Sequence, residues 1–305
     1  IEQYLFHSGT NNDNPVMLFL HCGPGLAYSP FAHVFQEKWE DLFTVVHWDQ
    51  RGAGKTLTKN SDQYPTLDLL LKDLLEIIQY LKQKYNQQKI ILLGHSWGTV
   101  LGSTFIKQYP GEVAYYIGVG QVINMFENER VGYEKVKQEI VKADDKKSLK
   151  KLEAIGEYPG KHLDSEFMKK CAQIRKLQEK YDLAIKMGLS VFIAAFQSPI
   201  FKWSDFSAMI KGPQASQGLM TALESFDLND EKDEYQIPIY YILGGKDWLT
   251  PFALAREHLG RIRAPRKKFY LIPGAGHATM IDQPELFYQA LSEIYHQGKI
   301  SDASR

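Results

Sequence analysis

One stretch of the sequence, residues 89–110, restricts the fold more than any other. Residues 90–93 are four consecutive apolar residues, two of them β-branched, which is typical of a strand buried on both faces of a parallel sheet. Residues 99–109 have the pattern of a helix, and Pro110 is placed to end it. Between them, residues 94–98 read Gly-His-Ser-Trp-Gly. The stretch therefore predicts a strand, a tight turn and a helix in direct succession.

The G-x-S-x-G pattern at this turn makes Ser96 the candidate nucleophile. Between a strand and a helix, the pattern is typical of a nucleophile elbow, a turn so tight that glycines are needed where a Cβ atom would collide. The pattern also occurs by chance in proteins where the serine has no catalytic role. The buried strand before it and the helix after it favour the catalytic interpretation, which still needs partners from elsewhere in the chain.

The composition limits the class of protein. The chain has 305 residues, 44% of them hydrophobic, so it can bury a substantial core as one large domain or as a core with an inserted lid. Its 36 basic and 36 acidic side chains cancel, and no basic arm or stripe is present. Because nucleic acid selects such basic surfaces, we do not expect it as a partner.

Cysteine usage and hydropathy bear on the cellular setting. Cys22 and Cys171 lie far apart without metal-ligand spacing, so the sequence indicates neither a disulfide framework nor a zinc site. No run approaches the roughly 20 apolar residues of a membrane-spanning helix. We expect a cytoplasmic protein, although the chain begins at Ile1 without methionine and an upstream signal or anchor segment is an open alternative.

A second glycine-rich loop follows an early strand. Residues 16–20 are continuously apolar, and residues 21–25 read His-Cys-Gly-Pro-Gly. Such a loop exposes backbone N–H groups and lets the chain approach a ligand closely. The N–H groups of Gly23 and of Trp97, the residue after the nucleophile, could together form an oxyanion hole. An ordinary strand-to-loop turn is the alternative interpretation.

The remaining pattern of the first part alternates strands and helices. We expect strands over residues 3–7, 44–47 and 115–120, and a long amphipathic helix over residues 67–85 with Thr66 as its N-cap. Asp49 and Arg51 lie in the loop after one of these strands, beside glycines. We interpret them as a charged pair that holds this loop, not as catalytic groups.

The middle of the chain has a different character. Residues 122–235 show no clear strand, and Lys- and Glu-rich helical patterns dominate, for example over residues 133–152 and 165–187. The apolar stretch over residues 189–206 is predicted to pack onto the core and could also roof a pocket. We therefore predict an α/β core formed by residues 1–121 and 236–305, with an all-helical cap inserted over residues 122–235.

The α/β pattern returns after residue 236. Strands are predicted over residues 238–243 and 267–272, and a final helix over residues 284–296. Each of these strands leads into a glycine-containing loop, and the two loops carry Asp247 and His277.

Ser96, Asp247 and His277 thus follow one another along the chain, each on a loop directly after a predicted strand. Serine, acid, histidine is the order of an α/β-hydrolase triad. Because the carboxyl ends of parallel strands meet at one edge of a sheet, we expect the three side chains to meet there. His21 and His95 lie on similar loops, beside glycines that the backbone needs, and we interpret them as structural supports.

The loops at residues 21–25, 49–52, 94–98 and 276–277 together resemble those of the proline iminopeptidase (prolyl aminopeptidase) group of α/β-hydrolases. The resemblance covers nearly the whole chain except the cap. It implies a serine hydrolase with a helical cap that needs no cofactor or metal. Well-known members remove an amino-terminal residue, commonly proline, from short peptides, so the expected partner is a short peptide or another small molecule.

Two positions depart from the pattern of that group. The first loop usually reads His-Gly-Gly-Pro-Gly, whereas Cys22 replaces the first glycine here and Gly23 is kept. Group members bind the substrate's amine with cap glutamates, for which Glu127, Glu129 and Glu224 are the candidates in this sequence. The alternative is that each of these is a surface carboxylate.

Two other functions stay open at this point. A carboxylesterase or lactonase acting on small acyl compounds could use the same triad. A ligand-binding protein could keep the fold without catalysis. A haloalkane dehalogenase or epoxide hydrolase is disfavoured, because enzymes of those types have a carboxylate at the position of Ser96. The oligomeric state is left undetermined by the sequence.

Overall fold

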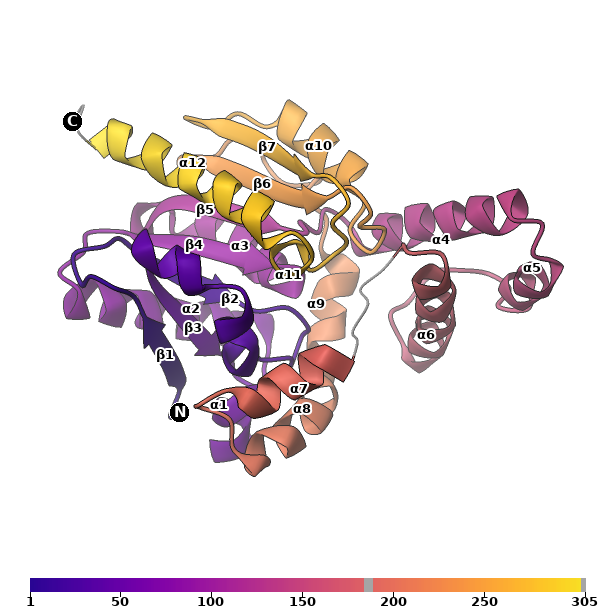
Figure 1. Cartoon of the computed structure of the whole chain (residues 1–305), viewed down its shortest axis with the longest axis horizontal. Coiled ribbons are helices and arrows are strands. Elements are labelled where there is room, and N and C mark those ends of the chain that lie inside the picture. The colour runs from indigo at the N-terminus through magenta and orange to yellow at the C-terminus, as the bar shows by residue number, and fades with distance from the viewer. Residues whose placement is uncertain (184–188, 303–305) are drawn as a thin grey trace.

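The computed structural model describes residues 1–183 and 189–302, and a seven-stranded sheet lies at its centre (Figure 1). The strands are β1 (Tyr4–Ser8), β2 (Val16–Leu20), β3 (Thr44–Asp49), β4 (Ile90–His95), β5 (Val113–Val119), β6 (Ile239–Gly244) and β7 (Lys267–Ile272). Their order across the sheet is β1-β3-β2-β4-β5-β6-β7. Only β1 pairs in the antiparallel direction among the described pairs. The predicted, mostly parallel α/β fold is confirmed, with small shifts at the strand ends.

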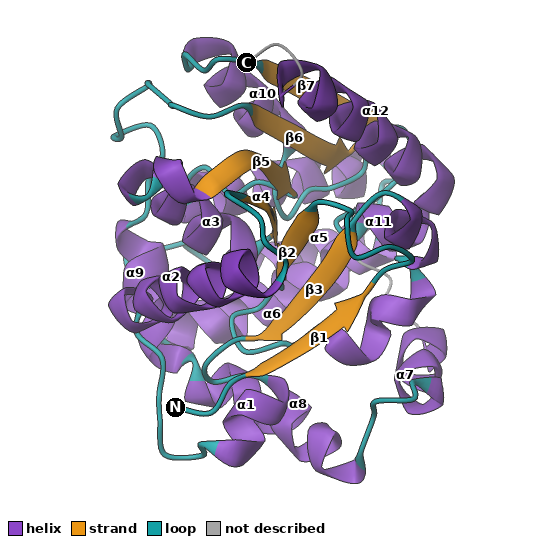
Figure 2. Cartoon of the chain, turned by 90° about the vertical axis from the view of Figure 1, so that its left-hand side faces the viewer, coloured by secondary structure: helices purple, strands orange, loops and turns teal. Residues whose placement is uncertain are grey.

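Helices cover both faces of this sheet, as Figure 2 shows. Side chains that alternate along a strand point to opposite faces, so neighbouring residues of β2 belong to different cores. Leu18 packs with one core under α2 (Leu67–Lys84), α3 (Trp97–Gln108) and α10 (Phe252–Arg261). Phe19 packs with the other, under the 3₁₀ turns η1 (Ser29–Val34) and η2 (Glu37–Asp41) and helix α12 (Pro284–Asp302). A sheet buried on both sides explains the continuous apolar runs of its central strands.

Two shorter helices complete the core. They are α1 (Gly54–Lys59), which follows the loop after β3, and α11 (Thr279–Asp282), which follows the loop after β7. The predicted N-cap of α2 is confirmed, because Thr66 Oγ1 accepts a hydrogen bond from the N–H of Leu69 at 3.2 Å.

A helical insertion separates β5 from β6. Its helices are α4 (Met125–Lys142), α5 (Lys146–Glu153), α6 (Ser165–Lys180), α7 (Leu189–Gln197), α8 (Trp203–Ala215) and α9 (Met220–Ser225), with a 3₁₀ turn, η4 (Gln217–Leu219), before α9. In the described part of this insertion, the strand-like pairing is limited to two isolated bridges, Asn124 with Asp227 and Glu234 with Arg263. The expectation of an inserted helical cap is confirmed, while its limits at residues 122 and 235 stay a prediction.

The helical pattern predicted over residues 133–152 is divided between two helices. The chain leaves the helix after α4 and starts again at α5, because Asp144 adopts a positive φ of 48°. The carboxylate of Asp145 then caps α5 by accepting the N–H of Ser148 at 3.0 Å. The predicted helix over residues 165–187 ends earlier, at Lys180, and its last part lies outside the described residues.

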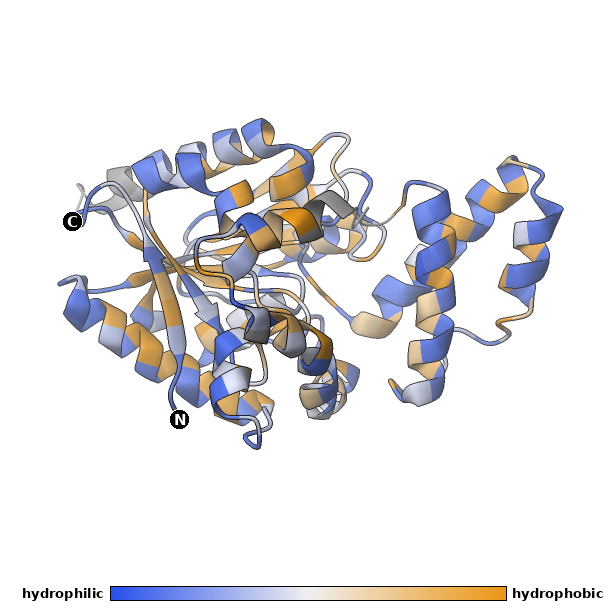
Figure 3. Ribbon diagram, turned by 60° about the horizontal axis from the view of Figure 1, so that its bottom comes forward, coloured by the Kyte–Doolittle hydropathy of each residue, from blue (hydrophilic) through white to orange (hydrophobic). Residues whose placement is uncertain are grey.

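The first three insertion helices form a unit that we name the α4–α6 lobe, residues 125–183. It projects away from the sheet (Figure 3) and has its own apolar cluster, which includes Val136, Ile140 and Ile174. By contrast, α8 packs directly on the core loop at residues 21–25. A Cβ atom on Gly212 would overlap the carbonyl oxygen of Gly25, so only glycine permits this approach.

Candidate functional site

Ser96 occupies a strained turn between β4 and α3. Its backbone has φ 55° and ψ −117°, a region that non-glycine residues rarely adopt, and its N–H donates to the carbonyl of Val119 at 2.9 Å. A Cβ atom on Gly98 would overlap the carbonyl oxygen of Leu20, and one on Gly94 would overlap that of Gly98. The glycines are therefore required by close packing, and the turn leaves Ser96 partly exposed while its neighbours are buried.

Asp247 and His277 lie on the loops after β6 and β7 and contact each other. Asp247 Oδ2 accepts a hydrogen bond from His277 Nδ1 at 2.9 Å, and both side chains are buried. The N–H groups of Leu249 and Thr250 each donate to Asp247 Oδ1 at 3.0 Å. Burial by itself raises the pKa of Asp247, but the charge of a protonated His277 and the hydrogen bonds from His277 and Thr250 outweigh it and hold the pKa below the ordinary value.

His277 also lies beside the strand that carries the serine. The buried His95, the residue before Ser96, donates from Nε2 to the carbonyl of His277 at 2.9 Å, and the two rings are 4.9 Å apart. A Cβ atom on Gly120, which follows β5, would lie 3.1 Å from the His277 ring. The structure contains no direct hydrogen bond between Ser96 and His277 within the described chain. Such contacts are often long before substrate binds and shorten in the complex.

The two expected oxyanion donors lie on adjoining segments. Gly23 is exposed and has φ 126°, and Trp97 is the first residue of α3, where helix geometry leaves the N–H without an intrahelical partner. Neither N–H donates to another group in the part of the chain that the structure describes. The start of α3 packs on the end of β2, as the Gly98 contact shows, and the loop with Gly23 follows β2 directly.

The supporting side chains of these loops are neutral. His21 donates from Nδ1 to the carbonyl of Cys22 at 2.8 Å and accepts the N–H of Gln50 at 3.2 Å, and burial lowers its pKa to about 4. Burial likewise lowers the pKa of His95 to about 3. The thiol of Cys22, at the unusual position in the loop, is buried, which raises its pKa to about 12. A protonated thiol is a poor nucleophile, so Cys22 is not a candidate nucleophile.

Asp49 and Arg51 both have structural partners, but the prediction that they form a charged pair with each other is wrong. Arg51 forms two hydrogen bonds of 2.8 Å with the carboxylate of Asp73, and both side chains are buried. Asp49 accepts the hydroxyl of Ser29 at 2.6 Å and the N–H of Lys55 at 2.7 Å. Neither residue contacts the Asp247–His277 pair through a described hydrogen bond.

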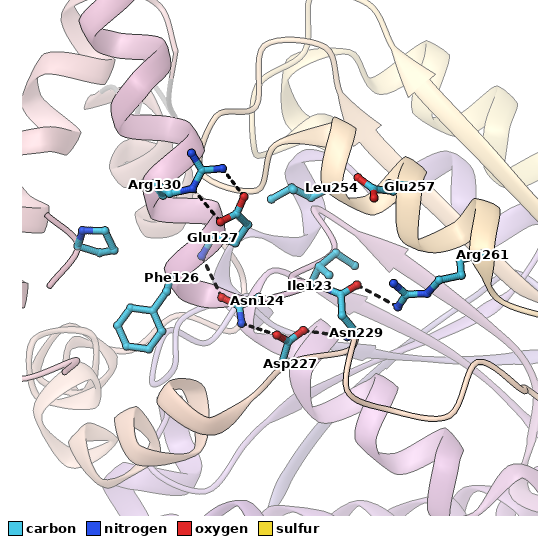
Figure 4. A pocket seen from close by; sticks show the side chains of 11 residues that line it. Ile123, Asn124, Phe126, Glu127, Arg130, Asp227, Asn229, Leu254, Glu257 and Arg261 are labelled. Carbon is cyan, nitrogen blue, oxygen red and sulfur yellow. Dashed lines mark hydrogen bonds and ion pairs between the residues drawn. The ribbon is translucent and has the colours of Figure 1, made fainter. Parts of the chain in front are cut away.

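All three cap glutamates have partners in the structure. Glu127 pairs with Arg130 on the same helix and lines a cavity of about 510 Å³ (Figure 4). Glu129 is buried and bonds to Arg175 and Tyr158. Neither makes a described contact with Ser96 or His277, so their role as amine-binding residues stays a prediction.

Glu224 forms hydrogen bonds with two residues of the α4–α6 lobe. It accepts the N–H of Leu163 at 2.8 Å and contacts His162 Nδ1 at 2.9 Å. The hydrogen bond from the N–H of Leu163 contributes most to holding the pKa of Glu224 below its ordinary value, and the contact with His162 contributes next. Its predicted role in binding substrate is likewise untested by these contacts.

Sequence reasoning missed Thr250, whose buried hydroxyl donates to Asp247 Oδ2 at 2.6 Å and lies 3.3 Å from His277 Nδ1. A signal was present: an Asp followed three residues later by Thr, just before Pro251 and a helix, is a pattern in which such side chains bond locally to each other and to the backbone. Thr250 therefore belongs to the same buried cluster as Asp247 and His277.

Two further features concern the described residues 1–183 and 189–302. They contain no group of three His, Cys, Asp or Glu side chains arranged to hold a metal ion. None of their helices combines the length and apolarity that crossing a membrane requires.

Comparison with known proteins agrees with the resemblance to proline iminopeptidases. A relative named probable aminopeptidase YbaC, from Bacillus subtilis (strain 168), is 27% identical over 299 residues, which are 95% of this chain and 92% of that protein. A proline iminopeptidase from Heyndrickxia coagulans is 25% identical over 295 residues, which are 93% of this chain and 91% of that protein.

The fold is shared with solved structures. The crystal structure of a proline iminopeptidase from Mycobacterium smegmatis matches with a TM-score of 0.68 at 19% identity, covering 98% of this chain and 96% of that one. At this identity the likeness concerns the fold alone. Residues 15–284 match a family model described as alpha/beta hydrolase fold, which spans most of the sequence. The chain therefore belongs to the alpha/beta hydrolase fold family.

Proposed function

We propose that this chain is a serine hydrolase that uses Ser96 as nucleophile, His277 as general base and Asp247 as the group that orients the imidazole. The observation that carries the proposal is the buried 2.9 Å hydrogen bond between Asp247 and His277, whose ring lies 4.9 Å from that of His95, the residue before the strained and partly exposed Ser96. A serine hydroxyl is barely ionised near neutral pH, so a base held in one tautomer beside it is the arrangement that the chemistry needs.

The proposed first half-reaction forms an acyl-enzyme. His277 Nε2 removes the proton of Ser96 as Oγ bonds to the substrate's carbonyl carbon, and the carbonyl π electrons move onto oxygen. The N–H groups of Gly23 and Trp97 stabilise this oxyanion, each contributing about 3 kcal/mol by comparison with similar donors. The oxyanion then collapses, the bond to the leaving group breaks, and the imidazolium of His277 protonates the departing nitrogen or oxygen.

The second half-reaction reverses these roles with water. His277 takes a proton from water as its oxygen attacks the acyl carbon, and the same N–H groups stabilise the second oxyanion. When the bond to Ser96 breaks, His277 returns the proton to Oγ. The products are a carboxylic acid and a regenerated enzyme, so no external oxidant, reductant or metal enters the balance.

The substrate class that we propose is a short peptide with a free amino terminus, from which the first residue, such as proline, is released. Two relatives that align over more than nine-tenths of this chain carry the names probable aminopeptidase and proline iminopeptidase. The matched loops at residues 21–25 and 94–98 support the same assignment.

One observation favours a second candidate, a carboxylesterase or lactonase. A peptidase of this kind needs carboxylates for the substrate's ammonium group, yet Glu127 and Glu129 already pair with Arg130 and Arg175. A neutral ester or lactone needs no such carboxylate. Peptidase activity therefore requires either that one of these ion pairs opens or that another acceptor binds the amine. Esterase activity requires neither.

Labelling with a fluorophosphonate probe tests the hydrolase proposal. We expect the wild-type protein to become covalently labelled at Ser96, because the probe phosphonylates a serine whose proton a neighbouring base removes. Ser96→Ala should remain unlabelled. A folded wild-type protein that does not react would contradict the proposal and favour a ligand-binding protein without catalysis.

A substrate panel tests the choice between peptide and ester. Prolyl-β-naphthylamide and other aminoacyl arylamides are compared with p-nitrophenyl acetate, using wild type and Ser96→Ala. The peptidase assignment expects Ser96-dependent release of β-naphthylamine. Turnover of the ester alone would refute the peptidase and support the esterase, and equal turnover by both proteins would exclude Ser96 as the nucleophile.

A further inference from the structure

The residue after the catalytic acid is bound to the α4–α6 lobe by its main chain. The N–H of Trp248 donates to the carbonyl of Leu183 at 3.3 Å, and the carbonyl of Trp248 accepts Gln178 Nε2 at 3.3 Å. Both main-chain polar groups of the residue next to Asp247 are therefore satisfied by the lobe and not by the core that carries the loop.

The side chain of Trp248 makes the same connection. It is partly buried and packs against the lobe's apolar cluster, and Lys135 Nζ lies 5.0 Å from the centre of its ring. On the other side of the acid, Lys246 forms an ion pair of 2.5 Å with Asp182. Asp247 thus lies between two residues that both contact the lobe.

The two helices of the lobe that face Trp248 are themselves closely fitted. A Cβ atom on Gly132 of α4 would lie 2.5 Å from the Trp248 carbonyl oxygen, a distance that real Cβ contacts do not reach. Gln178 of α6 is fully buried, and its Oε1 accepts Arg175 Nη1 at 2.6 Å. Arg175 in turn pairs with the buried Glu129 of α4. A continuous set of polar contacts therefore joins both helices to the loop after β6.

We propose that the α4–α6 lobe positions the catalytic acid, and that Gln178 and Gly132 are positioning residues for the Asp247–His277 pair. The inference rests on the proposed function, because it needs the triad to be the reacting group. A charge-assisted hydrogen bond depends steeply on geometry, so a small shift of the loop at Trp248 would lengthen the 2.9 Å contact and reduce support for the imidazolium.

The charges near His277 allow this role to be separated from a merely structural one. The ring faces the carboxylate of Asp247, the hydroxyl of Thr250 and the neutral ring of His95. Asp247 supplies the negative charge that favours a protonated imidazole. Displacing this charge should change how the labelling of Ser96 depends on pH, whereas simple destabilisation of the fold should not.

The test measures the rate of fluorophosphonate labelling of Ser96 against pH in the full chain. Gln178→Met keeps the side chain's approximate volume but removes its hydrogen bonds to Trp248 and Arg175. Gln173→Met, on the exposed face of the same helix, is the matched control. For Gln178→Met we expect the maximal rate to fall about tenfold or more and the acidic limb of the profile to move to lower pH, while the control matches wild type.

Gly132→Ala provides an independent variant. Its added methyl group would displace the loop at Trp248 by steric overlap, whereas Gln178→Met removes a hydrogen bond to that loop. We expect the same two changes, measured per folded molecule after the folded fraction is determined by circular dichroism. If folded Gln178→Met or folded Gly132→Ala labels within about twofold of wild type with an unchanged acidic limb, the positioning role is refuted. If wild type itself is not labelled while folded, the proposed function fails instead, so the two failures are distinguishable.

Discussion

Replacing Thr250 by valine tests the buried cluster around the acid most directly. The hydroxyl of Thr250 donates to Asp247 Oδ2 at 2.6 Å, and the residue is only 3% exposed. Valine has nearly the same shape, and the Thr250 N–H can still donate to Oδ1. The substitution therefore removes one hydrogen bond to a carboxylate and leaves the packing in place.

The expected loss of stability follows from the charge of the acceptor. A hydrogen bond to a charged group contributes roughly 1.5–3 kcal/mol, so we expect Thr250→Val to reduce the free energy of unfolding by about 2 kcal/mol. With an unfolding entropy of about 2.1 cal/mol/K per residue over 305 residues, this lowers Tm by roughly 3 °C. Thr250→Ser keeps a hydroxyl and should recover most of the difference.

The pH dependence of this loss has a definite sign. The pKa of Asp247 in the folded protein lies below its ordinary value of 3.8. The stabilisation by its ionised carboxylate is therefore fully present above about pH 4 and is lost as the pH falls through the lower, folded pKa. The difference in the free energy of unfolding between wild type and Thr250→Val should be constant near neutral pH and should become smaller in acid.

Calorimetry, urea unfolding and a double-mutant cycle with Asp247→Asn measure these effects. In the Asn background the acceptor is neutral, so the loss caused by Thr250→Val should shrink to about 1 kcal/mol. The reasoning would be refuted if Thr250→Val unfolded like wild type near neutral pH, or if its effect were the same with Asn at position 247. Either result would mean that the hydroxyl does not support the carboxylate.

Three other predictions concern stability. Gly98→Ala should cost about 3 kcal/mol or more, since its Cβ would overlap a backbone oxygen of β2, whereas Gly111→Ala, which meets nothing within 4 Å, should be near neutral in urea unfolding. Glu129→Gln should cost about 2 kcal/mol in urea unfolding, less than the roughly 3–5 kcal/mol of fully buried pairs, because the side chain of Arg175 is 26% exposed; a variant as stable as wild type would contradict this. Burial raises the pKa of Asp49 from 3.8 to about 6, so the folded state binds this proton more tightly than the unfolded state and stability should fall as pH rises from about 4 to about 6. Unfolding experiments across this pH range should show no such decline in stability for Asp49→Asn. If this variant instead shows the same pH dependence of stability as wild type, the raised pKa of Asp49 would be excluded as its cause.

The positions of the loops that form the site could be predicted because their signals are local. A continuous apolar run followed by a glycine-rich turn marks the end of a buried parallel strand, and the carboxyl ends of such strands share one edge of the sheet. The sequence therefore indicated that Ser96, Asp247 and His277 follow separate strands, and the structure pairs Asp247 with His277. Their catalytic roles stay a prediction that the labelling experiment tests.

What the sequence did not reveal depends on contacts between distant segments or on single backbone angles. The Lys- and Glu-rich pattern continues through Asp144, so nothing periodic marks the positive φ that separates α4 from α5. The pairing of Glu129 with Arg175 joins two helices and leaves no trace in the spacing of either. The contact of Gln178 with Trp248 is of the same kind. By contrast, pairs three or four residues apart on one helix, such as Glu127 with Arg130 and Lys135 with Glu139, have a spacing from which the sequence alone could predict them.

The strand order has a consequence for biosynthesis. β5 pairs with β4 along one edge, but its other edge is covered by β6, which begins at Ile239, after the whole insertion. During translation, the half-sheet β1 to β5 is therefore complete while the ribosome is still producing the insertion, and its edge strand β5 presents unpaired backbone groups to other chains. The nascent protein should be most prone to aggregation in that interval, when its serine loop already exists and the loops with the acid and the histidine have not yet been made.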